Sequence, residues 1–230
     1  MGQHVLPGNP PVEITLRKTA QARRISLRIS RLDGRVTLTC PLRTPDREAL
    51  AFAQEKADWL RHHLTVQPAA ASIGIGSELP FEGRLLRIAA GSGRLLRPEG
   101  DLLLVPGAAD RVAARLSGFL KQAARDRLAA ASDHYAARLG RGYARLSLRD
   151  TRSRWGSCTA DGGLMYSWRL VMAPPEVLAY VAAHEVAHLA EMNHSDAFWS
   201  VVTRLYGDYR DPRRWLREKG GDLHRYRFGD

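Results

Sequence analysis

One apolar stretch, residues 177–190, constrains this chain more than any other, because His184, Glu185 and His188 interrupt it. Pro174-Pro175 stands just before the stretch, which is typical of the first turn of a helix. Burying two imidazoles and a carboxylate in an apolar helix is costly unless they find strong partners. We therefore expect a buried helix whose polar side chains share one partner. The competing interpretation is two core histidines satisfied by hydrogen bonds, with Glu185 exposed.

The spacing His-Glu-x-x-His is that of a catalytic zinc site. Four residues advance a helix by about 400°, so His184 and His188 leave the same face and can bind one tetrahedral metal. Glu185 lies about 100° round the helix from His184, where it can approach a metal-bound water without being a ligand. The motif therefore predicts a Zn2+ cofactor, with Glu185 as the catalytic base that activates zinc-bound water for hydrolysis.

A catalytic zinc usually takes three protein ligands, and His194 is the preferred third ligand here. It lies six residues after His188, or about 600° along a continuous helix, so the helix must end before it. Asn193 tolerates the left-handed conformation that such an end requires, and Ser195 can cap a following helix. Carboxylates remain competing candidates for the third position: Glu191, Asp196, Asp208, Asp211 and Glu218.

The rest of the chain predicts an α+β fold in two parts. The first part, residues 1–106, is rich in strand-like runs, with a loose start over 1–11 and an Asp33-Gly34 hairpin turn. The second part, residues 107–230, holds a long helix over 110–139 and the histidine helix. Other expected elements are strands at 12–18, 25–31, 35–40, 81–89, 101–105, 145–149 and 164–171, and helices at 44–64 and 195–206.

Charge and composition limit the possible partners. The net charge is +11, but only four of the 35 basic residues are lysines, and the 31 arginines are scattered along the chain. Scattered charge predicts weak, non-specific attraction to polyanions. A basic nucleic-acid-associated module with a structural metal is an alternative, although structural zinc sites are usually closed and rich in cysteine. Nothing in the sequence indicates an oligomeric state.

The cellular compartment follows from what the sequence contains. No apolar stretch is long enough to span a bilayer, and residues 1–11 lack the features of a secretory signal. We therefore expect a cytoplasmic protein that does not bind membranes. Its two cysteines, Cys40 and Cys158, are too few for a disulfide scaffold. Cys158 could regulate the metal site as an additional ligand, although a small buried residue is the more common role.

Several separate motifs together resemble one known family, the YgjP-like metallopeptidase-domain family. They lie between about 150 and 200, in this order: Arg152-Ser153-Arg154-Trp155-Gly156-Ser157-Cys158, Tyr166-Ser167-Trp168-Arg169-Leu170, Pro174, His184-Glu185-Val186-Ala187-His188-Leu189, Asn193-His194-Ser195 and Phe198-Trp199. The resemblance implies a zincin-like, gluzincin-type hydrolase domain over 107–230. It also implies His184, His188 and His194 as zinc ligands, and Glu185 as the base.

The resemblance leaves the substrate open. Peptide-bond hydrolysis is the first hypothesis, and nucleoside triphosphate (UTP) pyrophosphatase activity, assigned to one branch of the family, is the second. Arg152 and Arg154 are candidates to bind phosphate or carboxylate. The strand at 164–171, with Tyr166 and Trp168, is the candidate to pair with an extended substrate. The alternatives are solvated surface arginines and a plain core strand.

Overall fold

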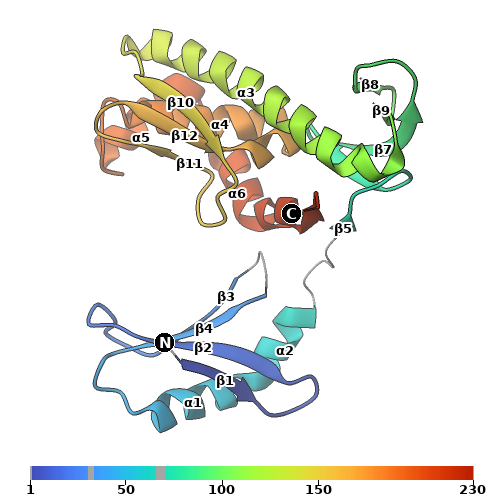
Figure 1. Cartoon of the computed structure of the whole chain (residues 1–230). Coiled ribbons are helices and arrows are strands. Elements are labelled where there is room, and N and C mark those ends of the chain that lie inside the picture. The colour runs from blue at the N-terminus through green and yellow to red at the C-terminus, as the bar shows by residue number, and fades with distance from the viewer. Residues whose placement is uncertain (1, 31–33, 66–70, 230) are drawn as a thin grey trace. The chain divides into compact units, whose positions relative to one another are not determined.

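The chain folds into two compact units, Met1–Ala69 and Ala70–Asp230. The structure, a computed structural model, describes residues 2–30, 34–65 and 71–229 (Figure 1). Each unit has a separate apolar core. The sequence placed the division at 106/107, and the structure moves it to 69/70. The reason is that residues from Leu79 to Val105 bury their apolar side chains in the core that also holds the histidine helix.

The first unit is a four-stranded sheet covered by two helices. The strand order is β1-β2-β4-β3, and β2 and β4 are parallel. Alternate residues of β2 are buried, as expected for a sheet with one covered face. The elements are β1 (Gly2–Leu6), β2 (Val12–Lys18), β3 (Ser26–Ile29), β4 (Val36–Cys40), α1 (Asp46–Glu55) and α2 (Ala57–Thr65).

Three expectations for this unit need comment. The expected loose start contains β1, which pairs with β2 and so satisfies its backbone groups. The single helix expected over 44–64 is two helices, because the backbone leaves helical geometry at Lys56. Asp33, in the predicted hairpin turn, lies outside the described residues; the antiparallel pairing of β3 with β4 is observed.

The second unit begins with a sheet that repeats the topology of the first. Its order is β6-β7-β9-β8, with β7 and β9 parallel and an antiparallel strand on each side. No repeat was predicted from the sequence, because this likeness lies in strand pairing. The elements are β6 (Glu78–Phe81), β7 (Arg84–Gly91), β8 (Arg97–Glu99) and β9 (Leu102–Pro106); β5 (Ala71–Ser72) pairs separately with β13 (Tyr226–Arg227).

The long α3 (Val112–Leu139) follows a 3-10 turn, η1 (Ala109–Arg111), and ends at Gly140, whose φ of 75° is a left-handed helix end. A three-stranded sheet comes next, in the order β10-β12-β11. Helices α3 and α4 contact each other, and α4 also contacts β11, α5 and α6 (Figure 1). The elements are β10 (Arg145–Arg149), β11 (Gly156–Cys158), β12 (Gly163–Ser167), η2 (Trp168–Met172), α4 (Pro175–Ala187), α5 (Asp196–Tyr206), α6 (Arg210–Glu218) and η3 (Gly220–Arg225).

The strand expected over 164–171 is shorter and lies at the centre of its sheet. It ends at Ser167, and a 3-10 segment follows. β12 pairs in parallel with β10 on one side and antiparallel with β11 on the other. Both of its edges are therefore occupied, so β12 cannot accept a substrate strand, and that prediction was wrong.

Two smaller points concern the helices and the thiols. In the described part of the chain, no helix combines the length and apolar character needed to cross a membrane. Cys40 is buried and Cys158 is partly buried, and both are free thiols.

Candidate metal centre

The helix predicted from the His-Glu-x-x-His motif is α4. It begins at Pro175 and is buried over most of its length, because Val177, Leu178 and Val181 pack into the core of the second unit. His184 lies in its last turn, and His188 is its C-cap residue. Their ring centroids are 5.1 Å apart. The spacing in the sequence therefore places both imidazoles side by side, as the helical period requires.

His194 returns to these two imidazoles from the turn after α4. The helix ends at Ala187, earlier than the expected stop at Asn193. His194 Nε2 lies 3.0 Å from His184 Nε2. The ligand atoms of the three histidines all lie within 4.8 Å of one another. Ser195 caps α5 as predicted, accepting a hydrogen bond from the Phe198 backbone N–H at 3.4 Å.

The three histidines have the chemistry that zinc requires. Burial, followed by the charges of His188 and His194, lowers the pKa of His184 to about 3. Burial also lowers the pKa of His188. Both rings are therefore neutral at pH 7, the form that binds a metal. His188 Nδ1 lies 3.0 Å from the Glu191 carbonyl oxygen, so as a donor it leaves Nε2 free for a metal.

The separation of the ring nitrogens is consistent with one tetrahedral ion. Two nitrogens at zinc bond lengths of about 2.0–2.1 Å lie roughly 3.3 Å apart in a tetrahedron. The observed separation of His184 Nε2 and His194 Nε2 is 3.0 Å. Phe198 stacks on the His188 ring, with centroids 4.5 Å apart, and thereby limits its rotation. The group fits a zinc ion with three protein ligands.

The competing carboxylates lie elsewhere. Within the residues that the structure describes, the group able to hold a metal consists of His184, His188 and His194. Three of the carboxylates form ion pairs with arginines: Asp208 with Arg210, Asp211 with Arg214 and Glu218 with Arg217. The backbone carbonyl of Glu191, and not its carboxylate, contacts the His188 ring. Asp196 is the first residue of α5.

Glu185 is buried beside the histidine cluster and is not one of its ligands. Its side chain is only 5% exposed. Burial raises its pKa to about 8, although the Arg154 charge opposes the shift. A carboxyl group with a pKa near the working pH can both accept and donate a proton. This is the property that a general base needs.

Gly156 makes room for Glu185, and this role was missed in the sequence. A Cβ atom at Gly156 would lie 2.6 Å from both Cγ and Oε1 of Glu185. Real atoms do not approach so closely, so a side chain at this position would displace the carboxylate. No strand was expected at Gly156, which the structure shows to be the first residue of β11; a glycine in a strand often marks the close approach of another group.

The predicted substrate-binding residues separate into two groups. Arg154 acts electrostatically on Glu185 and lines a groove of about 440 Å³ along the sheet, with hydroxyls from Ser157 and Thr159 among its walls. Arg152 acts instead on Asp150 and His224. Of the two arginines predicted to bind substrate, only Arg154 therefore acts on Glu185.

The two aromatic candidates are core residues, which corrects the prediction. Tyr166 is 0% exposed, and its hydroxyl lies 3.0 Å from Ser132 Oγ. Trp168 is 3% exposed and belongs to the same core. Side chains so deeply buried cannot contact a substrate at the histidine cluster. The alternation of the strand explains this: Leu164 and Tyr166 point inward together.

Cys158 has no place in the metal group of the described residues. Burial raises the pKa of its thiol to about 11, and the charges of Glu185 and Asp161 add to the shift. Cys158 is therefore a neutral thiol at pH 7, whereas metals bind the thiolate. It donates to the Thr159 carbonyl at 3.5 Å.

An aromatic wall surrounds the histidines on the side of α5. Phe198 and Trp199 both lie within 6 Å of the His184 ring, at 4.9 and 5.7 Å between centroids. The Arg213 guanidinium lies 4.7 Å from the Trp199 ring centre, and its charge contributes to the lowered pKa of His184. Arg213 was not predicted, because it comes from α6, far along the sequence.

Replacing His194 by alanine should weaken zinc binding more than about 100-fold, since loss of a ligand costs more than the 10–100-fold typical of outer-shell partners. Competition with a fluorescent zinc chelator measures this affinity. His134→Ala removes an exposed histidine of α3 and should leave the affinity unchanged. Equal affinities in both variants would remove His194 from the ligand set.

The lowered pKa of His224, in η3, predicts that the folded protein loses stability in acid. The His224 ring lies against the Trp155 ring in a tilted arrangement, with centroids 5.3 Å apart, and burial, then the charge of Arg169, lowers its pKa to about 4. The unfolded chain takes up this proton near pH 6.5, so stability is full above that pH and falls as the pH approaches 4. At pH 5 the loss from this one residue is about 2 kcal/mol.

The His224→Phe variant tests this prediction because it keeps an aromatic ring without the titrating group. In the presence of a chelator, its stability should fall less between pH 7 and pH 5 than that of the unmodified chain, by about 2 kcal/mol. Urea unfolding followed by tryptophan fluorescence measures the difference, since four of the five tryptophans lie in the second unit. Identical pH dependence in the two chains would contradict the assignment.

Comparisons with known proteins provide independent information. A sequence model of the YgjP-like family, metallopeptidase domain, matches residues 23–219. No curated protein matches the chain. Among solved structures, the metallopeptidase zymogen of Pyrococcus abyssi abylysin is similar over 40% of this chain and 95% of its own, with 19% identity and a TM-score of 0.37.

Proposed function

This chain belongs to the YgjP-like metallopeptidase-domain family, and from that premise we propose that it is a zinc-dependent hydrolase that cleaves peptide bonds. One observation carries the proposal: three imidazoles offer ligand atoms within 4.8 Å of one another, next to a buried glutamate that is not a ligand. A zinc ion with three protein ligands keeps a position open for substrate or water, unlike a closed structural site. The catalytic domain would then be zincin-like.

The residues of the chain have distinct roles in this proposal. His184, His188 and His194 would hold the zinc, which when bound supplies a Lewis acid and lowers the pKa of water towards about 7. Glu185 accepts a proton from the attacking water and later delivers it to the leaving group. Its burial supports both steps, because a pKa of about 8 allows proton exchange near neutrality. Gly156 leaves the space in which the Glu185 carboxylate lies.

The free edge of β11 supports a peptide as substrate. β11 lies at one edge of its sheet and contacts α4. Two backbone hydrogen bonds face β12. The Trp155 carbonyl oxygen accepts from the Ser167 N–H at 2.8 Å, and the Thr159 N–H donates to the Gly163 carbonyl oxygen at 3.0 Å. Backbone groups alternate in direction along a strand, so those of Gly156 and Cys158 point to the outer edge. An extended peptide can pair there by adding a strand, and the role proposed for β12 passes to β11.

Nucleoside triphosphate hydrolysis is the second candidate function. One observation favours it: Arg154 lies close enough to act on Glu185 and lines a groove with several hydroxyl groups. Guanidinium and hydroxyl groups are common phosphate ligands. The free strand edge favours the peptide, and the two substrates can be separated by assay.

The decisive experiment offers both substrate classes to the zinc-loaded full chain. Casein and a panel of nucleoside triphosphates are incubated in parallel, with new amino termini and released pyrophosphate as the readouts. The proposal predicts new amino termini, and predicts that Glu185→Gln forms them about 1,000-fold more slowly. Pyrophosphate release without peptide cleavage would replace the proposal by the second candidate. Turnover of neither substrate class would contradict both.

A further inference from the structure

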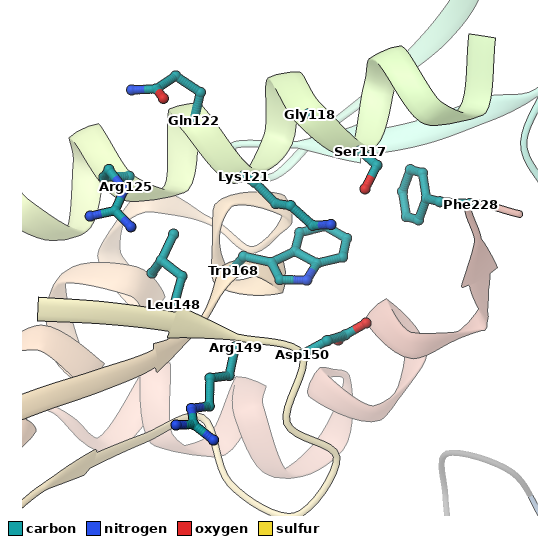
Figure 2. Close-up of a pocket in the computed structure, with 10 residues that line it drawn as sticks. All are labelled: Ser117, Gly118, Lys121, Gln122, Arg125, Leu148, Arg149, Asp150, Trp168 and Phe228. Atoms are coloured by element: carbon teal, nitrogen blue, oxygen red, sulfur yellow. The ribbon is translucent and has the colours of Figure 1, made fainter. Parts of the chain in front are cut away.

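A second pocket lies apart from the metal centre, between α3 and the end of β10 (Figure 2). Its volume is about 480 Å³. None of the residues that line it is a histidine of the cluster or Glu185. It is lined by Ser117, Gly118, Lys121, Gln122, Arg125, Leu148, Arg149, Asp150, Trp168 and Phe228.

One wall is a stripe of α3 that carries two cations and a hydroxyl group. Ser117, Lys121 and Arg125 follow one another at intervals of four residues, so they share one helix face. In the described structure, neither Lys121 nor Arg125 forms an ion pair with a carboxylate. Like charges one turn apart on a helix repel each other. An anion between them would remove that repulsion.

The neighbouring amide does not compete for this role. Gln122 donates to Asp126 Oδ1 at 2.9 Å, so its amide group is already engaged on the helix surface. Lys121 instead extends across the Trp168 indole, with Nζ 5.8 Å from the ring centre (Figure 2). Arg149, at the end of β10, adds a third cation to the lining.

The opposite wall combines buried aromatic rings with a carboxylate that is already neutralised. Asp150 accepts hydrogen bonds from Arg169 Nε at 2.6 Å and Arg169 Nη2 at 3.0 Å. It therefore cannot neutralise Lys121 and Arg125 as well. Trp168 is only 3% exposed, and its indole N–H has no hydrogen-bond partner in the described structure. A buried donor without a partner is unfavourable, because it has lost its hydrogen bonds to water.

Gly118 keeps this pocket open. It lies in the second turn of α3, where glycine is less favourable than alanine. A Cβ atom at Gly118 would meet nothing within 4 Å. Packing therefore does not require a glycine at this position. Because Gly118 has no side chain, the helix backbone is accessible from the pocket.

We propose that this pocket binds the terminal phosphate group of a small phosphorylated ligand, held by Lys121 and Arg125. A carboxylate is satisfied by one bidentate arginine, whereas a phosphate presents three acceptor oxygens and up to two charges to several donors at once. The lining offers two cations and a hydroxyl group on one helix stripe, and Arg149 also belongs to the lining. That set matches a phosphate better than a single carboxylate. The inference does not depend on the proposed peptidase activity.

The Trp168 indole N–H provides a local reporter of binding. The zinc-loaded full chain, labelled with nitrogen-15, is titrated with inorganic phosphate, and the Trp168→Phe variant identifies its indole signal. The signal should shift and saturate. Lys121→Gln with Arg125→Gln should weaken the binding at least 10-fold, whereas Lys219→Gln, which removes an exposed lysine in another region, should not. An absent or non-saturating shift, or equal affinity in the double variant, would overturn the proposal.

Further titrations test the site without removing charge and identify the source of the phosphate. Gly118→Leu fills the hollow and should also weaken binding at least 10-fold, while Gly118→Ala should have a smaller effect. A nucleoside triphosphate and a short single-stranded oligonucleotide without a terminal phosphate are then compared; the nucleotide should bind more tightly, and tighter binding of the oligonucleotide would overturn the assignment to a terminal phosphate. Tetraglutamate binding as tightly as phosphate-bearing ligands would overturn the assignment to phosphate.

Discussion

Changing Glu185 to glutamine should lower the turnover number about 1,000-fold, within the range of 10²–10⁴ that general bases contribute, while zinc binding stays unchanged. Glutamine has the same shape as glutamate, so the packing of this 5% exposed side chain is preserved. The amide cannot accept the proton that the carboxylate takes. Because Glu185 is not part of the histidine cluster, zinc affinity has no reason to change.

The measurement combines peptide-cleavage kinetics with zinc stoichiometry on the same preparation. Glu176→Gln is the matched control, since it removes an exposed carboxylate from the first turn of the same helix. The control should retain full activity. If Glu185→Gln retained activity as well, Glu185 would have no part in the proton transfer. Loss of zinc in this variant would instead assign it a role in binding the metal.

Changing Gly156 to alanine should lower the turnover number about 100-fold, because a displacement of roughly 1 Å at a catalytic group has that effect. The added Cβ would lie 2.6 Å from Glu185 Oε1, so the carboxylate must move. The histidines lie on other elements and keep their positions. We therefore expect a reduced turnover number with normal zinc affinity. Gly156 is a positioning residue in this account, since it acts through Glu185.

A second glycine separates this effect from a general cost of substitution. Gly142→Ala adds a Cβ that meets nothing within 4 Å, and it should leave the turnover number unchanged. A merely structural role for Gly156 would lower the melting temperature and the zinc affinity together with activity. Displacement of the base changes the turnover number and its pH profile at constant zinc affinity. Full activity in Gly156→Ala would contradict the role assigned to this glycine.

Local patterns in the sequence predicted the histidine helix and the cap at Ser195. His184 and His188 were brought together by the helical period alone, and the cap of α5 needs only neighbouring residues. The position of His194 followed from the argument that six residues cannot stay on one helix face. These predictions succeeded because the interactions span few residues.

Features that depend on distant segments were not predictable in the same way. The contact between Gly156 and Glu185 joins β11 to α4 across 29 positions of the sequence, and nothing local indicates it. Burial of Tyr166 depends on Ser132 of α3, and the central place of β12 depends on strand pairing. The division at 69/70 likewise follows from packing, because β6–β9 share the core of α3 and α4.

The central claim is that three imidazoles hold one divalent cation and leave it an open position. Zinc K-edge X-ray absorption of the zinc-loaded chain tests this most directly, because it reports the atoms bound to the metal. The account predicts one zinc per chain with three imidazole nitrogens and an additional oxygen at about 2.0–2.1 Å. A sulfur neighbour, fewer than three imidazoles, or a chain that binds no zinc would contradict it.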